Sequence, residues 1–338
     1  MSEINVPAEW APHKAIWTCW PSLADLWQEN LEPARAEVSA MVKALIATTP
    51  EGGAGDVVHV LAYGAEAYAN ARAALPDAVK VHDVPFGDIW LRDTGPIFAR
   101  SGEDAIALRF GFNGWGGKFT LEHDDTVGDA VASLSHTSMR QADCVLEGGA
   151  VDHDGEGTVL TTRQCVLHPN RNGDWTQERA EAHFAASLGA KKVLWLGDGL
   201  LNDHTDGHVD NIARFIGPGR VMCMEAYGDD DPNRDVLDAI AADLATMTDA
   251  VGRTLEVIRI PSPGLVLDAD GETVPASHMN FIIGNASVVV PHFGTPSADA
   301  ALRAIAAVFP GRRVVGINST AILTGGGSFH CITQQEPL

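Results

Sequence analysis

The sequence has no run of about 18 consecutive apolar residues, the length that a transmembrane helix needs. Its first ten residues, Met1 to Trp10, contain the acidic Glu3 and no apolar core segment, so they do not have the pattern of a secretory signal. We therefore expect a cytoplasmic protein without a membrane partner.

Cysteine is scarce, and its spacing fits no pairing scheme. The five cysteines form no CxxC pair and are odd in number: Cys19, Cys144, Cys165, Cys223 and Cys331. A disulfide scaffold and a structural zinc site both need closely spaced or paired cysteines, so both are disfavoured. The pattern is typical of a reduced, cytoplasmic protein.

Basic residues are also few. The chain has 23 Lys and Arg against 45 Asp and Glu, a formal net charge of -22. Nucleic-acid binding depends on basic patches, so this balance argues against a nucleic-acid partner. It suits a small cationic substrate, which an acidic protein attracts, although an acidic surface also serves solubility alone.

What the sequence does contain indicates an α/β protein. With 338 residues, 45% of them hydrophobic, the chain can bury a sizeable core. Strand patterns and helix patterns alternate over its whole length, in about five strand-helix-strand units that each have an extra strand. No low-complexity linker interrupts them, so we predict one catalytic domain over 1–338. The predicted helices are 38–45, 65–75, 177–188, 235–247 and 298–309, and the predicted strands are 57–61, 79–84, 105–112, 157–167, 191–196, 220–224, 255–260, 286–290 and 314–317.

The C-terminal segment Gly325-Gly326-Gly327-Ser328-Phe329-His330-Cys331 has the composition of a nucleophile loop. Glycines permit positive φ and close approach of a ligand, and their free N–H groups can stabilise a thiolate. A thiol attacks only as the thiolate, so a donor-rich loop suits a reactive Cys331. The alternative is a Gly-rich turn with an uninvolved cysteine.

Two further loops combine carboxylates with aromatic or glycine residues. Asp88, Trp90, Arg92 and Asp93 follow a strand, and two carboxylates near an aromatic ring can hold a planar cation. An Asx-type turn with an internal Asp–Arg pair is the alternative. Glu147 ends an apolar run before two glycines, where it could orient a histidine, hold a cation or simply lie in a surface hairpin.

The densest polar segment is Asp203-His204-Thr205-Asp206-Gly207-His208-Val209-Asp210-Asn211. If the segment is extended, His208 and Asp210 point to the same face and could supply a general acid/base beside a cation anchor. A metal site is the rival interpretation, but no HExxH spacing or cysteine set supports it. From their patterns, we expect 112–118 to be a solvent loop or flap and His278 to be a structural histidine.

Taken together, these segments resemble the agmatine deiminase family of guanidine-modifying enzymes. The resemblance runs over almost the whole chain, and the motifs occur in one order. They are Pro7-Ala8-Glu9-Trp10, Trp17-Thr18-Cys19-Trp20-Pro21, Trp90-Leu91-Arg92-Asp93-Thr94-Gly95-Pro96, Gly114-Trp115-Gly116-Gly117, Glu147-Gly148-Gly149, Thr205-Asp206-Gly207-His208-Val209-Asp210-Asn211, Gly325-Gly326-Gly327 and His330-Cys331-Ile332-Thr333-Gln334-Gln335.

The resemblance implies a pentein fold, a five-bladed α/β propeller of ββαβ units around a central active site. It also implies hydrolysis of agmatine to N-carbamoylputrescine and ammonia without metal or organic cofactor. The residue roles that it implies are Cys331 as nucleophile, His208 as general acid/base, Glu147 as the partner of that histidine, Asp93 and Asp210 as guanidinium-binding carboxylates, and Trp90 and Asp206 as further substrate-binding residues. Ser328-Phe329 departs from the Asn-Ile that the family usually has before His-Cys. We expect a homo-oligomer, a dimer by preference.

Three other functions remain open at this point. A deiminase of free or peptidyl arginine would need a cationic partner for a carboxylate, which Arg92, Arg163 or Arg171 could supply. A metal-dependent hydrolase would use the Asp203–Asp210 segment. A non-catalytic guanidine-binding protein would have no use for the complete set of thiol, histidine and carboxylates.

Overall fold

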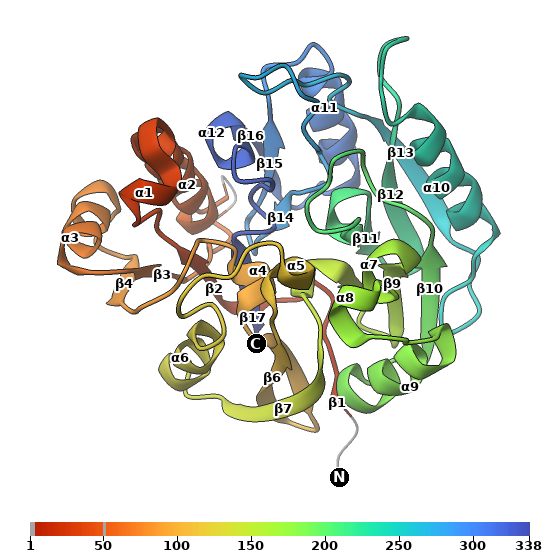
Figure 1. Cartoon of the computed structure of the whole chain (residues 1–338), viewed down its shortest axis with the longest axis horizontal. Coiled ribbons are helices and arrows are strands. Elements are labelled where there is room, and N and C mark those ends of the chain that lie inside the picture. Colours follow the sequence, from red (N-terminus) through yellow and green to blue (C-terminus); the bar gives the residue numbers. More distant parts are fainter. Residues whose placement is uncertain (1–3, 50–51) are drawn as a thin grey trace.

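The computed structural model describes residues 4–49 and 52–338, so the predicted absence of a secretory signal falls partly outside them, at 1–3. The chain is mixed α/β, with its strands in five separate sheets. In Figure 1 these sheets lie around the middle of the molecule. The sheets are β1-β5-β6-β7 (Ile4–Asn5, Ile97–Ser101, Asp104–Gly111, Ser138–Val145), β10-β9-β8 (Lys192–Leu196, Thr158–Thr162, Val151–His153), β11-β12-β13 (Ala213–Gly217, Arg220–Glu225, Glu256–Pro261), β14-β15-β16 (Ile282–Ile283, Ser287–His292, Arg313–Asn318) and β17-β2-β3-β4 (Thr333–Pro337, His13–Cys19, Val58–Ala62, Lys80–Asp83).

Every sheet combines antiparallel with parallel pairing. In each, one strand pairs antiparallel on one side and parallel on the other, as β12 does with β11 and β13. Parallel neighbours need a long crossover connection, and each parallel pair is joined by a segment that contains helix. The α-helices are α1 (Ala24–Trp27), α2 (Leu31–Ile46), α3 (Ala65–Ala74), α4 (Leu91–Thr94), α5 (Gly114–Gly117), α6 (Val127–Leu134), α7 (Arg163–Val166), α8 (Pro169–Asn172), α9 (Gln177–Leu188), α10 (Arg234–Thr246), α11 (Ala298–Val308) and α12 (Thr320–Leu323), and the short 3-10 helices are η1 (Gln28–Asn30), η2 (Gly148–Ala150) and η3 (Val209–Asn211).

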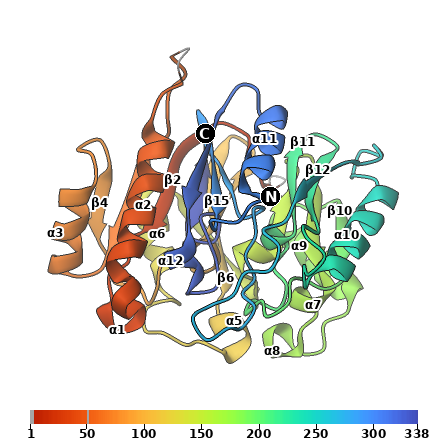
Figure 2. The same ribbon diagram turned by 90° about the horizontal axis from the view of Figure 1, so that it is seen from above.

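The longer helices lie on the outside with their apolar stripes turned inward. Figure 2 shows α2 and α3 on one side of the molecule and α10 on the other, with β2 and β15 between them. On α10 the stripe is Leu237, Ile240 and Leu244, all buried. Burial of such stripes, more than helix propensity, stabilises helices of this length.

The predicted elements are confirmed wherever hydrophobic periodicity defines them, and they fail where it does not. Helix α9 has the predicted bounds, α10 is shifted by one residue at both ends, and α11 ends one residue earlier than predicted. The predicted strand 157–167 is wrong in its second half. It ends at Thr162, whose hydroxyl accepts a hydrogen bond from the Cys165 backbone N–H (3.3 Å) and so caps α7.

The last strand lies in the interior, although its sequence is polar. β17 pairs with β2 and so places the C-terminal segment next to the N-terminal one. Glu336 on β17 accepts hydrogen bonds from Lys14 (2.6 Å) and from the Trp17 indole (2.9 Å). Figure 1 shows β17 near the middle of the molecule, and Cys331 comes just before this strand in the chain.

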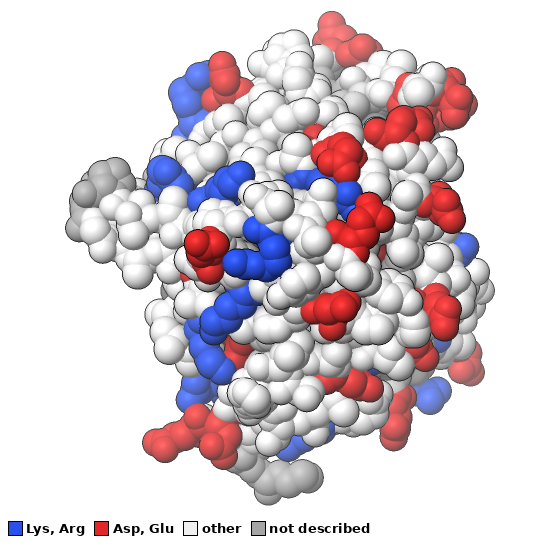
Figure 3. Space-filling model, turned by 90° about the vertical axis from the view of Figure 1, so that its left-hand side faces the viewer, with Lys and Arg blue, Asp and Glu red and all other residues white. Residues whose placement is uncertain are grey.

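Within the described ranges, no helix has both the length and the apolar character needed to cross a membrane. The surface charge is mixed despite the net charge of -22. On the face drawn in Figure 3, Lys and Arg side chains are interspersed with Asp and Glu.

Candidate active site

A cavity of about 460 Å³ opens beside Cys331. Its walls are aromatic and acidic, and the glycine triplet 325–327 forms part of them. Of the residues that the structure describes, those that line the cavity include no Lys or Arg. The cavity therefore suits a cation with an apolar stem. The residues that matter most for the argument are Trp27, Asp88, Trp90, Asp93, Trp115 and Cys331.

The glycine triplet serves mainly to admit Trp90. A Cβ at Gly325 or Gly327 would come within 2.5 or 2.7 Å of the Trp90 ring. Only Gly326 has the positive φ (+98°) that the sequence pattern predicts for this loop. Trp90 therefore packs directly against the loop that carries Cys331, as expected for a residue that lines the pocket.

Cys331 is held by Asn280 and Asp210. The Asn280 side-chain amide donates to Sγ (3.0 Å), and its oxygen accepts from the Cys331 backbone N–H (3.2 Å). Asp210 Oδ2 lies 3.6 Å from Sγ. Burial, with the nearby carboxylates of Asp210 and Asp93, raises the pKa of the Cys331 thiol well above its usual range. The raised pKa favours the protonated thiol.

Asp93 is fixed from two sides. Its Oδ2 accepts a hydrogen bond from the Trp115 indole (2.9 Å), and its Oδ1 accepts one from the Gly149 backbone N–H (2.9 Å). Trp115 is buried, so the predicted solvent loop at 112–118 is wrong. Its backbone has φ of +54°, an uncommon conformation that the contact with Asp93 helps to maintain.

Asp210 is connected to the N-terminal segment through His330. His330 contacts Asp210 Oδ2 through Nδ1 (2.7 Å) and Glu9 Oε2 through Nε2 (2.8 Å). Burial would raise the pKa of Asp210, but the contact with His330 outweighs it and the pKa is lowered. Asp210 Oδ1 is buried and has no hydrogen-bond partner in the described part of the chain. Asp210 thus presents a charged, available oxygen next to the thiol.

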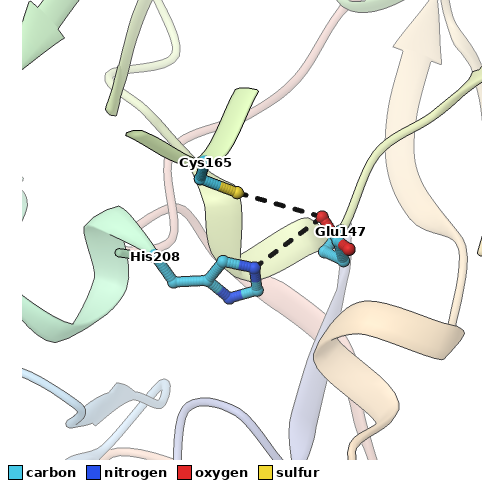
Figure 4. Close-up of side chains that lie close together, drawn as sticks. All are labelled: Glu147, Cys165 and His208. Carbon is cyan, nitrogen blue, oxygen red and sulfur yellow. Dashed lines mark hydrogen bonds and ion pairs between the residues drawn. The ribbon is translucent and has the colours of Figure 1, made fainter. Parts of the chain in front are cut away.

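His208 lies between two carboxylates, of which Figure 4 draws that of Glu147. Its Nε2 is 3.8 Å from Glu147 Oε2, and its Nδ1 is 3.8 Å from Asp93 Oδ1. Burial opposes the charged imidazole, but Asp93 and Glu147 outweigh it and raise the pKa of His208 well above 6.5. The raised pKa favours the protonated imidazole, the form that a general acid needs. The extended segment predicted for His208 and Asp210 is wrong, because Val209–Asn211 forms the 3-10 helix η3.

Arg171 holds Glu147 in place. Its Nε donates to both carboxylate oxygens (3.0 and 2.8 Å), and Glu147 is fully buried. Asp206, predicted to bind substrate, instead pairs with Arg171 (2.7 Å) and Lys118 (2.5 Å) and does not line the cavity. Its predicted contact with substrate stays a prediction.

The side chains of His208, Asp93 and Asp210 all lie close to the backbone of Gly149. A Cβ there would lie 2.5 Å from His208 Nδ1, 3.0 Å from Asp93 Oδ1 and 3.1 Å from Asp210 Oδ2. The structure thus brings together four of the predicted site residues, Asp93, Glu147, His208 and Asp210, with Cys331 next to Asp210.

The Asp203–Asp210 segment does not converge as a metal site would. Asp203 accepts hydrogen bonds from Thr205, Asp206 forms ion pairs, and His204 lies in the cavity wall. Across residues 4–49 and 52–338, the groups of three neighbouring ligand side chains are Glu147, Cys165, His208 and Asp154, Glu156, Asp249.

Sequence reasoning did not assign the contacts that Asn280, His330, Glu9 and Arg171 make here, and it considered Arg171 only as a partner for the carboxylate of arginine. His330 and Glu9 stand in the quoted motifs, so a signal existed, but it did not say what they touch. His278 is structural as predicted, with Nδ1 2.9 Å from the Pro291 carbonyl.

Comparison with known proteins finds relatives of this chain in one enzyme family. The sequence pattern of the Porphyromonas-type peptidyl-arginine deiminases matches residues 5–337. The agmatine deiminase of Stutzerimonas stutzeri is 38% identical, with 98% of this chain and 95% of that protein covered. The agmatine deiminase of Pseudomonas aeruginosa strain UCBPP-PA14 is also 38% identical, with the same coverage. Among solved structures, agmatine deiminase of Enterococcus faecalis superposes with a TM-score of 0.92 at 33% identity, over 99% of this chain and 96% of that one.

Proposed function

Because the chain belongs to the Porphyromonas-type peptidyl-arginine deiminase family, we propose that it hydrolyses the guanidinium group of agmatine to N-carbamoylputrescine and ammonia. The observation that carries the proposal is the pair of buried carboxylates around the Cys331 thiol: Asp93 lines the cavity, Asp210 Oδ2 lies 3.6 Å from Sγ, and the described lining includes no Lys or Arg. Such a site binds a flat cation by charge-assisted hydrogen bonds.

The choice of agmatine over arginine rests on the other end of the substrate. Arginine has an α-carboxylate, which would need a cationic partner in the cavity. The three candidates are engaged elsewhere: Arg92 with Gln334 and Gln335, Arg163 with backbone carbonyls of β10, and Arg171 with Glu147. The full-length relatives that carry the name agmatine deiminase support the same choice.

The first half of the reaction forms a covalent intermediate. A guanidinium held by Asp93 and Asp210 neutralises the charges that keep the Cys331 thiol protonated, so its proton leaves to solvent. The thiolate adds to the guanidinium carbon, and His208 gives its proton to the departing nitrogen, which leaves as ammonia. An amidino group remains bound to sulfur.

The second half reverses the proton flow. His208, now neutral, takes a proton from a water molecule that attacks the same carbon. The carbon–sulfur bond breaks, the thiolate leaves and the ureido product is released. Glu147, held by Arg171, keeps the imidazole in place through both halves.

The experiment that tests the proposal compares three substrates side by side. Ammonia release is measured with agmatine, free arginine and an arginine-containing peptide at matched concentrations. We expect agmatine to give the highest kcat/KM by at least about 100-fold, since a buried unpaired carboxylate is costly. Faster turnover of either arginine substrate would overturn the choice of agmatine, and release from none of them would overturn the activity.

Asp210→Asn should lower kcat/KM by about 30- to 150-fold. The change keeps the size of the side chain but removes the charge that faces the guanidinium and the sulfur, a loss of about 2–3 kcal/mol for a preorganised contact. Steady-state kinetics with agmatine measure it. Asp198→Asn, which alters an exposed carboxylate, is the matched control and should be neutral. Near-normal kcat/KM in Asp210→Asn would place the cation anchor elsewhere.

Gly149→Ala should lower kcat by roughly 100-fold while the protein stays folded. The new methyl group forces His208, Asp93 or Asp210 to move, and a shift of about 1 Å in a reacting group costs on that order. The control is Gly197→Ala, because a Cβ at Gly197 meets no atom within 4 Å. Equal rates in Gly149→Ala and Gly197→Ala would contradict the close approach of His208, Asp93 and Asp210 to Gly149.

The pH profile of kcat/KM should be bell-shaped, with its maximum on the alkaline side of neutrality. The pKa of the Cys331 thiol is raised, so the thiolate forms only at higher pH. The acid limb of the profile is therefore shifted to higher pH. The pKa of His208 is also raised, so the acid it provides is lost only at higher pH. Initial rates measured across pH test this. A maximum below neutral pH would show that the pKa values of Cys331 and His208 are not raised.

We also propose that the five sheets are the blades of a five-bladed α/β propeller and that 1–338 is one catalytic domain. The repeated pairing of an antiparallel and a parallel neighbour in every sheet supports the first proposal. The site supports the second, because its residues come from segments throughout the chain, from Asp93 to Cys331. Cytoplasmic localisation and a homodimer stay predictions.

A further inference from the structure

Three side chains of metal-binding type meet behind the catalytic histidine (Figure 4). Glu147 precedes η2, Cys165 lies in α7 and His208 precedes η3. Cys165 Sγ and His208 Nε2 lie 4.0 and 3.8 Å from Glu147 Oε2, and the three ligand atoms are all within 4.8 Å of one another. All three residues are buried. From this geometry we propose that Glu147, Cys165 and His208 form an inhibitory site for Zn²⁺ and similar thiophilic divalent metal ions.

The spacing of the ligands fits a tetrahedral ion. Ligand atoms around zinc, at bond lengths of about 2.0–2.3 Å, lie roughly 3.3–3.6 Å apart. The distances to Glu147 Oε2, 4.0 and 3.8 Å, exceed this spacing by roughly half an ångström, and the third separation is within 4.8 Å, so the side chains need to move inward to bind an ion. A thiolate, an imidazole and a carboxylate are a common zinc ligand set, and a water molecule can take the fourth position.

His208 is free to act as a ligand. Neither of its ring nitrogens has a hydrogen-bond partner within the described residues, although the side chain is fully buried. Nε2 faces Glu147 and Cys165, while Nδ1 faces Asp93 at 3.8 Å. Metal-bound histidines usually donate their other N–H to a carboxylate, and Asp93 is placed to accept it.

Arg171 limits the affinity of the site. Its Nε donates to both oxygens of Glu147, so a metal ion at Oε2 must share the carboxylate with a positive charge. We therefore expect reversible binding and not a permanent structural metal. Binding also needs a deprotonated thiol and a neutral imidazole, so it strengthens as pH rises.

Occupation would stop the reaction without touching Cys331. The inference rests on the proposed function in one respect: a metal ion on Nε2 replaces one of the two ring protons, so His208 can no longer be the doubly protonated acid that gives a proton to ammonia. Cys165 has no part in the proposed reaction, so its removal separates metal binding from catalysis.

The test compares Zn²⁺ inhibition in wild type, Cys165→Ser and Cys165→Ala, with Cys144→Ser as the matched thiol control. We expect the Cys165 variants to keep the zinc-free kcat/KM and to raise the Zn²⁺ inhibition constant at least tenfold, while Cys144→Ser does neither. Unchanged zinc sensitivity in the Cys165 variants would overturn the site. The alanine variant covers the case in which a buried serine prevents folding.

A spectroscopic measurement that needs no turnover separates this inference from the proposed function. Co²⁺ bound by a thiolate gives a sulfur-to-metal charge-transfer band. We expect the band in Cys331→Ser, which lacks the nucleophile, and its loss in the Cys165 variants. A band that is lost in Cys331→Ser and kept in the Cys165 variants would assign the metal to the nucleophile and overturn the proposal.

Discussion

Replacing Cys331 with alanine should reduce hydrolysis of agmatine to background, a loss of at least about 10⁴-fold in kcat, which is the scale seen when a nucleophile is removed. No other described thiol lines the cavity, so none can take its place. The carboxylates of Asp93 and Asp210, which we propose bind the guanidinium, remain, and the variant should still bind agmatine. Calorimetric titration of the variant with agmatine and a turnover assay together measure the two effects.

The fold should survive this change. Cys331 is buried, but its backbone bonds to Asn280 and Arg92 do not involve the sulfur. Deleting one sulfur atom at the edge of a cavity leaves little new empty space, so thermal unfolding should shift by only a few degrees. Cys144→Ala, at a half-buried cysteine outside the cavity, is the control and should keep full activity. Wild-type turnover in Cys331→Ala would remove the nucleophile assignment.

Predictions from the sequence were reliable where the signal is local. The strands β12 and β15 and the helices α9 and α10 follow from apolar periodicity over a few residues, because the core selects those positions. Candidate site residues such as His208 and Asp210 were found for the same reason, since both stand in one dense polar segment. Local patterns do not require knowledge of what lies opposite them in the fold.

The predictions failed where a residue depends on a distant partner. Polar β17 becomes an interior strand only because β2, more than 300 positions earlier in the chain, supplies Trp17 and Lys14 to Glu336. Glu9 is explained by partners far along the chain: His330, which is 321 positions away, Arg214 and the Ile283 backbone N–H. Such pairs have no periodicity, and a single sequence contains nothing that links their two members.

The same dependence on distant partners explains why the burial of Trp115 was not predicted from the sequence. A segment of glycines around one tryptophan has the composition of a flexible loop. Its order comes from the hydrogen bond to Asp93 and from edge-on packing against Phe112, with ring centroids 4.9 Å apart. A loop that looks mobile in sequence thus becomes a rigid support for a carboxylate of the site.

Replacing His208 with glutamine should lower kcat by about 10²- to 10⁴-fold, the contribution of a general acid/base. Glutamine fills similar space and can hydrogen-bond to Glu147 and Asp93, but it cannot carry a proton to ammonia. The alkaline limb of the pH profile should disappear with it, because that limb reports the loss of the histidine proton. Rates across pH measure both effects, with His183→Gln, at a half-buried histidine outside the site, as control.

A second variant separates a catalytic role from a structural one. His208→Ala leaves a space between Glu147 and Asp93 that added imidazole can enter, and we expect imidazole to restore part of the lost rate in a concentration-dependent way. If His208 only held its neighbours in place, glutamine would restore more activity than alanine with imidazole, and the alkaline limb would remain. Because the raised pKa values of Cys331 and His208 both depend on Asp93, the alanine variant should also change how fast the thiol is alkylated. A thiol whose alkylation rate is unaffected at every pH would mean that the imidazole and the sulfur do not act on a common substrate.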